Sequence, residues 1–386
     1  MVTAIFGFVG AAIDYSRASA TRVALQAALD STALMLSKEV DPAHPENLPA
    51  KAEKYFRTMF TRKDAHVDSV NAVLGNPQQG EFTLTVTAAA TINTTVARVI
   101  GQKEMNIGST GIVRWGIKRL ELALALDNTG SMAQSGKMDA LKTSVHNMLD
   151  TLQKAAKKPD DVKVAIIPFD TKVNVGASNI SQTYVDFNFN NINKNTWNGC
   201  VIDRAKNYDV QDTAPVQGNS ASLFPAATCS GLVEAIPLTN DWATLNARVD
   251  QMNPAGNTNV TIGLVWAWHA LTNTQPFTQA SDPQPDLDKV IILLTDGTNT
   301  QNRFTKTTSL IDQRTELVCA NLKNTAATLP PNGIKVYTVR VIDGNATLLK
   351  DCASRPEYYY DVQQADQLIA VFSSIAQNLA NLRIAQ

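Results

Sequence analysis

The sequence is poor in charge, histidine and cysteine. Charged residues make up 18% of the 386 positions, and the formal net charge is −1. Because no basic cluster interrupts this balance, the chain lacks the electrostatic footprint of a nucleic-acid-binding protein. The four cysteines share no CxxC spacing and the four histidines lie far apart, which argues against a zinc site. At this length, two structural units are expected rather than one core.

The cysteines fall into two well-separated pairs, Cys200 with Cys229 and Cys319 with Cys352. An even count in this arrangement suggests a Cys200–Cys229 and a Cys319–Cys352 disulfide, and hence an oxidising compartment. Four buried free thiols are the alternative, since free cysteine is often buried. The connectivity stays open, because four cysteines allow three pairings.

A long apolar run is also lacking. The opening segment MVTAIFGFVGAAI is too short for a membrane span, which needs about 20 apolar residues. It has neither the basic leader nor the cleavage site of a signal peptide. Either the chain begins partway through a membrane helix, or the segment is the end of a buried helix. The first is favoured, because the helical pattern continues through Tyr15–Val40 without Pro or Gly. We therefore expect a partial membrane helix over residues 1–40.

Residues 41–118 are expected to form a small α+β domain. A Pro-rich break at Asp41–Pro49 ends the first helix, and a turn is expected at Asn76–Gly80. Thr- and Val-rich alternation then indicates strands. The predicted elements are a helix over Ala50–Thr61 and strands over Glu81–Val99 and Met105–Ile117.

From residue 119 to 386 strands alternate with helices, which is typical of a doubly wound, Rossmann-like α/β sheet. The predicted strands are Leu120–Leu126, Val162–Phe169, Val290–Thr295, Ile334–Ile342 and Tyr358–Asp361. The predicted helices are Lys137–Lys157, Trp242–Met252, Thr261–Thr272, Thr308–Leu322 and Ala365–Ile384. An Asn- and Ser-rich insertion occupies residues 171–238, with one late strand at Leu232–Pro237. An insertion of this length usually has a function or is held in place by a cross-link such as a disulfide.

Three polar clusters follow strands or precede a helix in this second region: Asp127–Ser131, Gly256–Asn259 and Thr295–Thr298. In open α/β sheets the ligand binds beyond the carboxyl ends of the strands, where these clusters are expected to meet. They offer carboxylate and hydroxyl oxygens without sulfur or imidazole, a donor set that suits Mg²⁺, Mn²⁺ or Ca²⁺. The candidate ligands are Asp127, Thr129, Ser131, Thr258 and Asp296.

This D-x-T-x-S, Thr and T-D-G pattern resembles the metal-ion-dependent adhesion site (MIDAS) of von Willebrand factor A-type domains. The resemblance implies that the Thr129, Ser131 and Thr258 hydroxyls approach the ion, while Asp127 and Asp296 hold it mostly through waters. One coordination position would then accept an acidic side chain of a partner. The family's usual motif has Ser where this sequence has Thr129, and threonine keeps the hydroxyl.

The same loops allow other interpretations. Asp, Asn, Thr and Ser before a helix commonly cap its amides, and T-D-G can be an ordinary turn. An Asp after the first strand is also similar to haloacid-dehalogenase-like phosphatases, which need a second Asp two residues later as acid and base. That position is Thr129. His146 and His269 fall in predicted helices and are expected to be core or surface residues. A non-enzymatic protein is therefore favoured over a metal-dependent hydrolase or a structural spacer with a vestigial site.

The whole chain resembles the TadG-like proteins of the Tad/Flp pilus assembly machinery. The likeness rests on GAAIDYSRASATRVALQAALDSTAL, WNGCVIDR, LLTDGTNTQ and LKDCAS with the closing helix. Relatives carry a basic segment and a fuller apolar run before the position of Met1. The resemblance implies a helix anchored in the bacterial inner membrane, a pilin-like part, and an adhesion-type domain in the periplasm or at the cell surface. It also implies a pilus or secretion-machinery subunit as the partner that offers the carboxylate.

Overall fold

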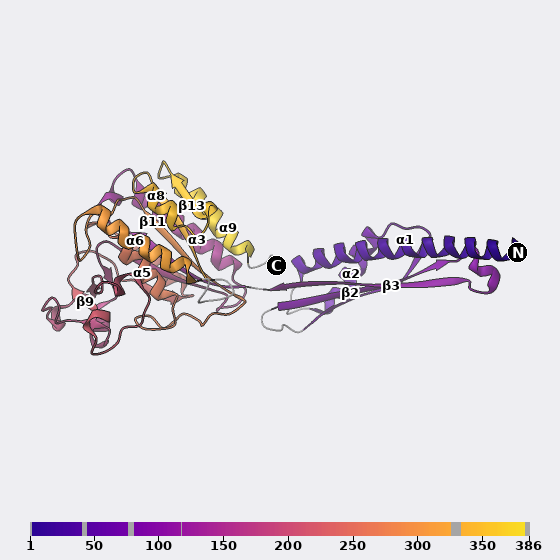
Figure 1. Ribbon diagram of the computed structural model, residues 1–386, viewed down its shortest axis with the longest axis horizontal. Helices are drawn as coiled ribbons and strands as arrows, with labels where there is room; N and C mark the ends of the chain where they lie inside the picture. The colour runs from indigo at the N-terminus through magenta and orange to yellow at the C-terminus, as the bar shows by residue number, and fades with distance from the viewer. Residues whose placement is uncertain (1, 41–44, 76–80, 117, 326–332, 383–386) are drawn as a thin grey trace. The chain divides into compact units, whose positions relative to one another are not determined.

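The computed structural model describes residues 2–40, 45–75, 81–116, 118–325 and 333–382. The chain divides into two units, one running to Ile117 and the other beginning at Lys118 (Figure 1). Parts of the predictions lie outside the described residues: the turn at Asn76–Gly80, the start of the break at Asp41 and the predicted strand end at Ile117. The predicted end of the last helix, Ile384, also lies outside them.

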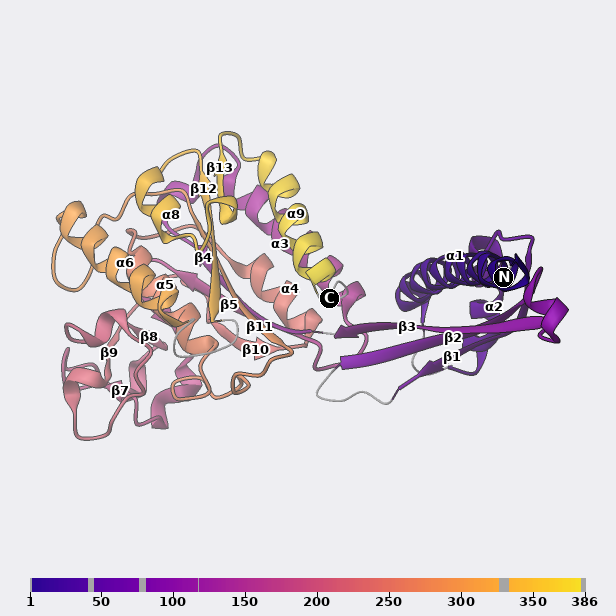
Figure 2. The same cartoon turned by 45° about the vertical axis from the view of Figure 1, so that its right-hand side comes forward.

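The first unit is one long helix packed on a small antiparallel sheet (Figure 2). Its elements are α1 (Val2–Glu39), α2 (Leu48–Met59), β1 (Ala65–Leu74), β2 (Glu81–Asn93) and β3 (Glu104–Gly116). Leu25, Leu29 and Leu36 of α1 share a core with Leu84 and Val86 of β2. The segments expected as a separate helix and a separate small domain therefore have a common core. Over the described residues, no helix combines the length and apolar character that a membrane crossing requires.

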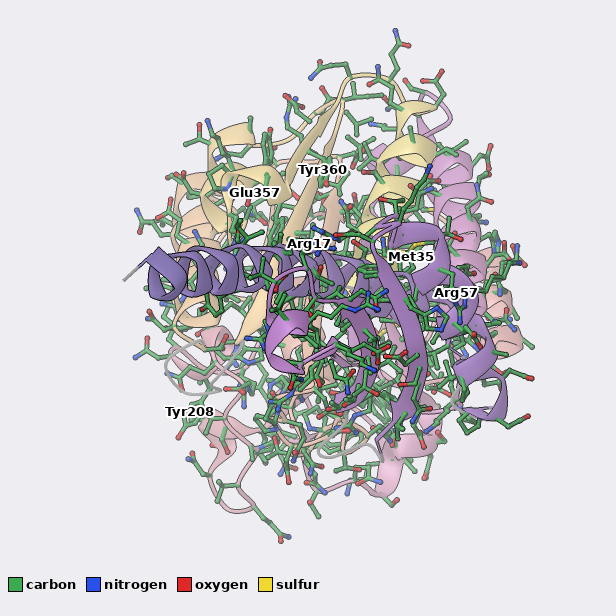
Figure 3. The ribbon with its side chains drawn as sticks, turned by 90° about the vertical axis from the view of Figure 1, so that its right-hand side faces the viewer. Arg17, Met35, Arg57, Tyr208, Glu357 and Tyr360 are labelled. Carbon is green, nitrogen blue, oxygen red and sulfur yellow. A yellow bond between two sulfur atoms is a disulfide. The ribbon has the colours of Figure 1, made fainter. Side chains whose placement is uncertain are left out.

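A buried aspartate ties α1 to the turn between β2 and β3. The Asp14 carboxylate accepts the backbone N–H groups of Thr95, Val96 and Ala97 at 2.8, 2.9 and 2.8 Å. These hydrogen bonds lower the pKa of Asp14 to about 2. Arg17, labelled in Figure 3, stands one turn further along α1 and lies 3.9 Å from the same carboxylate.

One prediction for this unit was wrong, and one strand was not predicted. The strand predicted over Glu81–Val99 ends at Asn93, because the chain turns there and gives its next amides to Asp14. Strand β1 was not predicted at all. It mixes polar and apolar residues, and its pairing with β2 is irregular between Val67 and Ser69, which breaks the simple alternation that marks a strand.

The second unit contains the doubly wound sheet predicted from the sequence. Five strands run parallel in the order β13–β12–β11–β4–β5. Their bounds are β4 (Arg119–Asp127), β5 (Val162–Phe169), β11 (Leu287–Thr295), β12 (Ile334–Val341) and β13 (Tyr359–Val362). β10 (Ile236–Thr239) pairs antiparallel with β5. The central strands are buried on both faces, which explains their nearly continuous apolar sequence.

Helices cover both faces of this sheet (Figures 1 and 2). Along β4, Leu122 and Leu124 face one helical layer, whereas Ala123 and Ala125 face the other. The leucine side packs against α3 (Lys137–Ala155), α4 (Trp242–Gln251) and α9 (Gln367–Leu382). The alanine side packs against α5 (Val260–Ala270), α6 (Thr308–Lys323) and α8 (Ala346–Cys352). Alternating side chains of one strand thus build two cores.

The insertion extends the sheet beyond β5 with short strands. These are β6 (Val173–Asn174), β7 (Val185–Asp186), β8 (Cys200–Val201) and β9 (Phe224–Ala227). A Cys200–Cys229 disulfide fixes β8, and a Cys319–Cys352 disulfide joins α6 to α8. The predicted late strand is displaced to Ile236–Thr239. Tyr184 and Phe224 of the insertion complete the core on the α5 side, so the insertion is a packed part of the unit.

Candidate metal centre

Four of the five predicted ligands lie at or after the ends of two strands, and the fifth, Thr258, lies in the loop before α5. Asp127 is the last residue of β4, and Asp296 follows β11 directly. These strands are parallel neighbours, with Leu126 paired to Leu294, so both carboxylates leave the sheet at the same edge. The loop before α5 is hydrogen-bonded to the loop after β4, because Gly130 N donates to Gly256 O at 3.1 Å. We call Asp127, Thr129, Ser131, Thr258 and Asp296 the strand-end site.

Asp127 is held rigidly at the base of this site. Its Oδ1 accepts the backbone N–H of Thr129 at 2.8 Å, and its Oδ2 accepts the Thr295 hydroxyl at 2.6 Å. The residue is completely buried. Burial, followed by the charge of Asp296, raises the pKa of Asp127 to about 6. A carboxylate in this setting gains from a nearby positive charge.

Hydroxyl groups link the two carboxylates. The hydroxyls of Thr129 and Ser131 lie 3.1 Å apart, and Ser131 Oγ donates to Asp296 Oδ1 at 2.6 Å. On its other oxygen, Asp296 meets the Lys137 ammonium, with Nζ 2.5 Å from Oδ2. This contact is an ion pair between two buried side chains.

Thr258 lies in the second loop, directly before α5, and faces the same part of the site. Two hydrogen bonds with Thr300 hold its backbone in place: Thr258 N donates to Thr300 Oγ1 at 2.8 Å, and Thr300 N donates to Thr258 O at 2.9 Å. A Cβ added to Gly297 would lie 3.1 Å from Thr258 Oγ1 and 3.6 Å from Ser131 Oγ. Both hydroxyls therefore face one small space that a larger side chain would fill.

The donor set of this space fits a small hard cation. It consists of hydroxyl and carboxylate oxygens, the ligands that Mg²⁺ takes together with retained waters. Within the described residues, no three His, Cys, Asp or Glu side chains are grouped as metal ligands. The strand-end site has only two carboxylates, so hydroxyls and waters would supply the remaining ligands.

Two segments of the chain match known protein families. Residues 1–35 match the family described as putative Flp pilus-assembly TadE/G-like, and residues 230–374 match the von Willebrand factor type A domain. The chain carries a VWA domain. Its N-terminal segment is of the Tad type, as the sequence resemblance implied. No curated protein matches the sequence.

Solved structures with detectable similarity include two kinds of pilus protein. The pilus adhesin SpaC from Lactobacillus rhamnosus GG has a TM-score of 0.42 and 14% identity, over 83% of this chain and 34% of that one. The vWF domain of the type V pili tip protein Mfa5 from Porphyromonas gingivalis has a TM-score of 0.41 and 12% identity, over 70% of this chain and 97% of that one.

A third similar structure is proximal thread matrix protein 1 from the mussel byssus, solved with a zinc-occupied MIDAS motif. It has a TM-score of 0.38 and 17% identity, over 68% of this chain and 46% of that one. This chain thus spans a third to a half of the length of SpaC and of the thread protein.

Three residues beside the VWA strand-end site were not predicted. Asp170 directly follows the end of β5, much as Asp127 stands at the end of β4. A Cβ added to Gly256 would lie 2.7 Å from Oδ2 of Asp170. Burial raises the pKa of Asp170. The rule that led to Asp127 could have found Asp170. Thr295 belongs to the T-D-G cluster, but its hydrogen bond to Asp127 is not visible in the sequence. Lys137 gives no sequence signal, because its contact with Asp296 is long-range.

The two helical histidines occupy structural positions. His269 of α5 is fully buried beside Phe224 and Trp266, and burial lowers its pKa well below the ordinary value. His146 of α3 contacts Asn246 and lies 2.8 Å from Asp250 of α4. Within the described residues, neither histidine forms a hydrogen bond with the strand-end site: His269 packs among aromatic rings, and His146 joins α3 to α4.

Proposed function

We propose that this protein is a non-enzymatic interaction protein of Tad/Flp pilus assembly or adhesion, and that its VWA domain binds a divalent cation at the strand-end site. Asp127, Thr129, Ser131, Thr258 and Asp296 would hold Mg²⁺, with Mn²⁺ or Ca²⁺ as substitutes. The observation that carries the proposal is that the Thr258 and Ser131 hydroxyls both lie beside Gly297, and that Ser131 is hydrogen-bonded to Asp296, one of two buried carboxylates at this edge of the sheet.

The cation would serve as a bridge to another protein. Hydroxyls and water leave a coordination position that an acidic side chain can take. The matching Tad segment and VWA domain favour a pilus or secretion-machinery subunit as this partner. The two disulfides favour the periplasm or the cell surface, because such bonds persist in oxidising compartments. We further propose that the N-terminal segment tethers the chain to the inner membrane.

The arrangement at Asp127 supports binding rather than hydrolysis. Its two oxygens are occupied by Thr129 N and Thr295 Oγ1, and the position two residues later carries a hydroxyl where a phosphatase of the haloacid-dehalogenase type would need an acid. A carboxylate used in this way positions a cation more readily than it attacks a substrate.

A capture experiment tests the proposal. The full chain is immobilised and offered purified pilus subunits of the same bacterium, with Mg²⁺ or with EDTA. We expect capture in Mg²⁺, loss in EDTA, and loss in Asp127→Ala and Asp296→Ala. The matched control is Asp150→Ala, an exposed aspartate on α3. Circular dichroism checks that each variant is folded. Capture that is indifferent to EDTA and to both site variants would contradict the proposal.

A further inference from the structure

A buried lysine stands at the strand-end site. Lys137 is the first residue of α3, and its side chain is 3% exposed. Its Nζ lies 2.5 Å from Asp296 Oδ2 and 3.7 Å from Asp343 Oδ2. The Asp296 side chain is fully buried, whereas that of Asp343 is 72% exposed. Water screens the charge of Asp343, so Asp296 is the main electrostatic partner of Lys137.

The position of Lys137 is unfavourable for reasons of stability alone. A helix N-terminus carries partial positive charge, which disfavours a cation in the first turn. Burial of an ammonium adds a desolvation cost. The backbone nevertheless directs the chain there, because Gly136 takes a left-handed conformation with φ of +68° and α3 starts at the next residue. The ion pair with Asp296 offsets these costs.

The lysine changes the charge of the site. Ionised Asp127 and Asp296 with the Lys137 ammonium leave one net negative charge at the strand-end site. A divalent cation converts this to one net positive charge. Without the ammonium, the loaded site would be neutral. The neighbouring Asp170 has a polar partner of its own, since its Oδ1 accepts the backbone N–H of Lys172 at 2.6 Å.

We infer that Lys137 is a specificity-determining residue that weakens the hold on the cation and makes the loaded site positive, so that the site recruits a carboxylate. This inference rests on the proposed function. The proposed role of Lys137 differs from a purely structural role in one respect. Removal of the ammonium must change the affinity for the cation and the affinity for a carboxylate in opposite directions. At a partly buried site one unit charge at a few ångströms is worth at least about tenfold in each affinity.

The test compares the full chain with Lys137→Met, which keeps the length of the side chain and removes its charge. Mg²⁺ affinity is measured by calorimetry. Acetate binding is measured on the Mn²⁺-loaded protein by water relaxivity. We expect Mg²⁺ to bind at least about tenfold more tightly to Lys137→Met, and acetate at least about tenfold more weakly. Lys154→Met, on the exposed side of α3, is the matched control and should change neither affinity. Lys137→Arg keeps the charge and should retain the wild-type affinities for Mg²⁺ and for acetate.

The outcomes separate the inference from the proposed function. If the wild type binds Mg²⁺ and folded Lys137→Met binds it no more tightly, the inference is overturned and the metal site stands. If neither protein binds Mg²⁺, both are overturned. If Lys137→Met does not fold, a Lys137→Arg protein that loses acetate binding while it keeps Mg²⁺ affinity overturns the inference, and one that keeps both affinities supports it.

Discussion

Ser131 donates a 2.6 Å hydrogen bond to Oδ1 of Asp296, and so joins the loop after β4 to the loop after β11. The bond brings a candidate ligand from the first loop into contact with a candidate ligand from the third. It also leaves Oδ2 of Asp296 to Lys137. The strand-end site is therefore connected before any cation binds, and the predictions below concern the parts of that connection.

Replacement of Ser131 by alanine removes a candidate ligand and unpairs one oxygen of Asp296. We expect Mg²⁺ affinity to fall at least about tenfold, since even the outer partners of metal ligands have effects of this size. Calorimetric titration of Mg²⁺ measures the change. Ser309→Ala, on the exposed start of α6, is the matched control. An unchanged Mg²⁺ affinity in Ser131→Ala would exclude Ser131 as a ligand.

Gly297→Ala tests the space between the two hydroxyls. The new Cβ would lie 3.1 Å from Thr258 Oγ1, and the backbone of Gly297 is not in the left-handed region, so crowding rather than backbone strain is the expected effect. Mg²⁺ affinity should fall about tenfold, while stability should change by no more than about 1 kcal/mol. Gly108→Ala, whose Cβ would meet nothing closer than 4.0 Å, is the control. Equal Mg²⁺ binding by both variants would refute this view of the space.

The raised pKa of Asp127 predicts a pH dependence of cation binding. Burial raises this pKa to about 6, and a protonated carboxyl holds a cation poorly. Mg²⁺ affinity should be constant well above pH 6 and fall as the pH drops through that value. Without a cation, Asp127 makes the fold less stable as the pH rises from the ordinary value of 3.8 to about 6. Calorimetry across pH measures the affinity, and Asp127→Asn should remove the step near pH 6.

Asp14 predicts the opposite pH behaviour in the first unit. Its hydrogen bonds with three backbone amides lower its pKa to about 2, so its contribution to stability is present above 3.8 and is lost as the pH falls from 3.8 to 2. Asp14→Asn should accelerate hydrogen exchange at Thr95, Val96 and Ala97 at pH 7. Asp30→Asn, on the same helix, is the control. Exchange rates that are equal in the two variants would contradict this role.

The Cys319–Cys352 disulfide predicts a stability effect away from the site. It joins α6 to α8 across 33 residues, and both cysteines are buried. Removal of both sulfurs by Cys319→Ala and Cys352→Ala should lower the free energy of unfolding by about 3–4 kcal/mol, because the unfolded chain gains freedom. Urea denaturation measures the loss. Mg²⁺ affinity should be retained in the folded variant, and a parallel loss of Mg²⁺ binding would mean that the disulfide also supports the site.

Much of the second unit could be predicted because buried parallel strands are visible as apolar runs. Val162–Phe169 was predicted with the bounds that the structure has, and the polar residues after Leu126 and Leu294 indicated the strand ends. The two-residue strands of the insertion could not be predicted, since their pairing depends on contacts far apart in the sequence. The position of Lys137 against Asp296 likewise follows from the turn at Gly136 and the packing of α3.

The most direct test of the central claim is anomalous scattering from crystals of the full chain grown with Mn²⁺. The account predicts one strong peak at the strand-end site, about 2.1 Å from Ser131 Oγ, with Thr129, Thr258, Asp127 and Asp296 around it. Data from a Ser131→Ala crystal should show a weaker peak or none. A saturating Mn²⁺ concentration that leaves no peak between these residues, or places the ion elsewhere, would contradict the account.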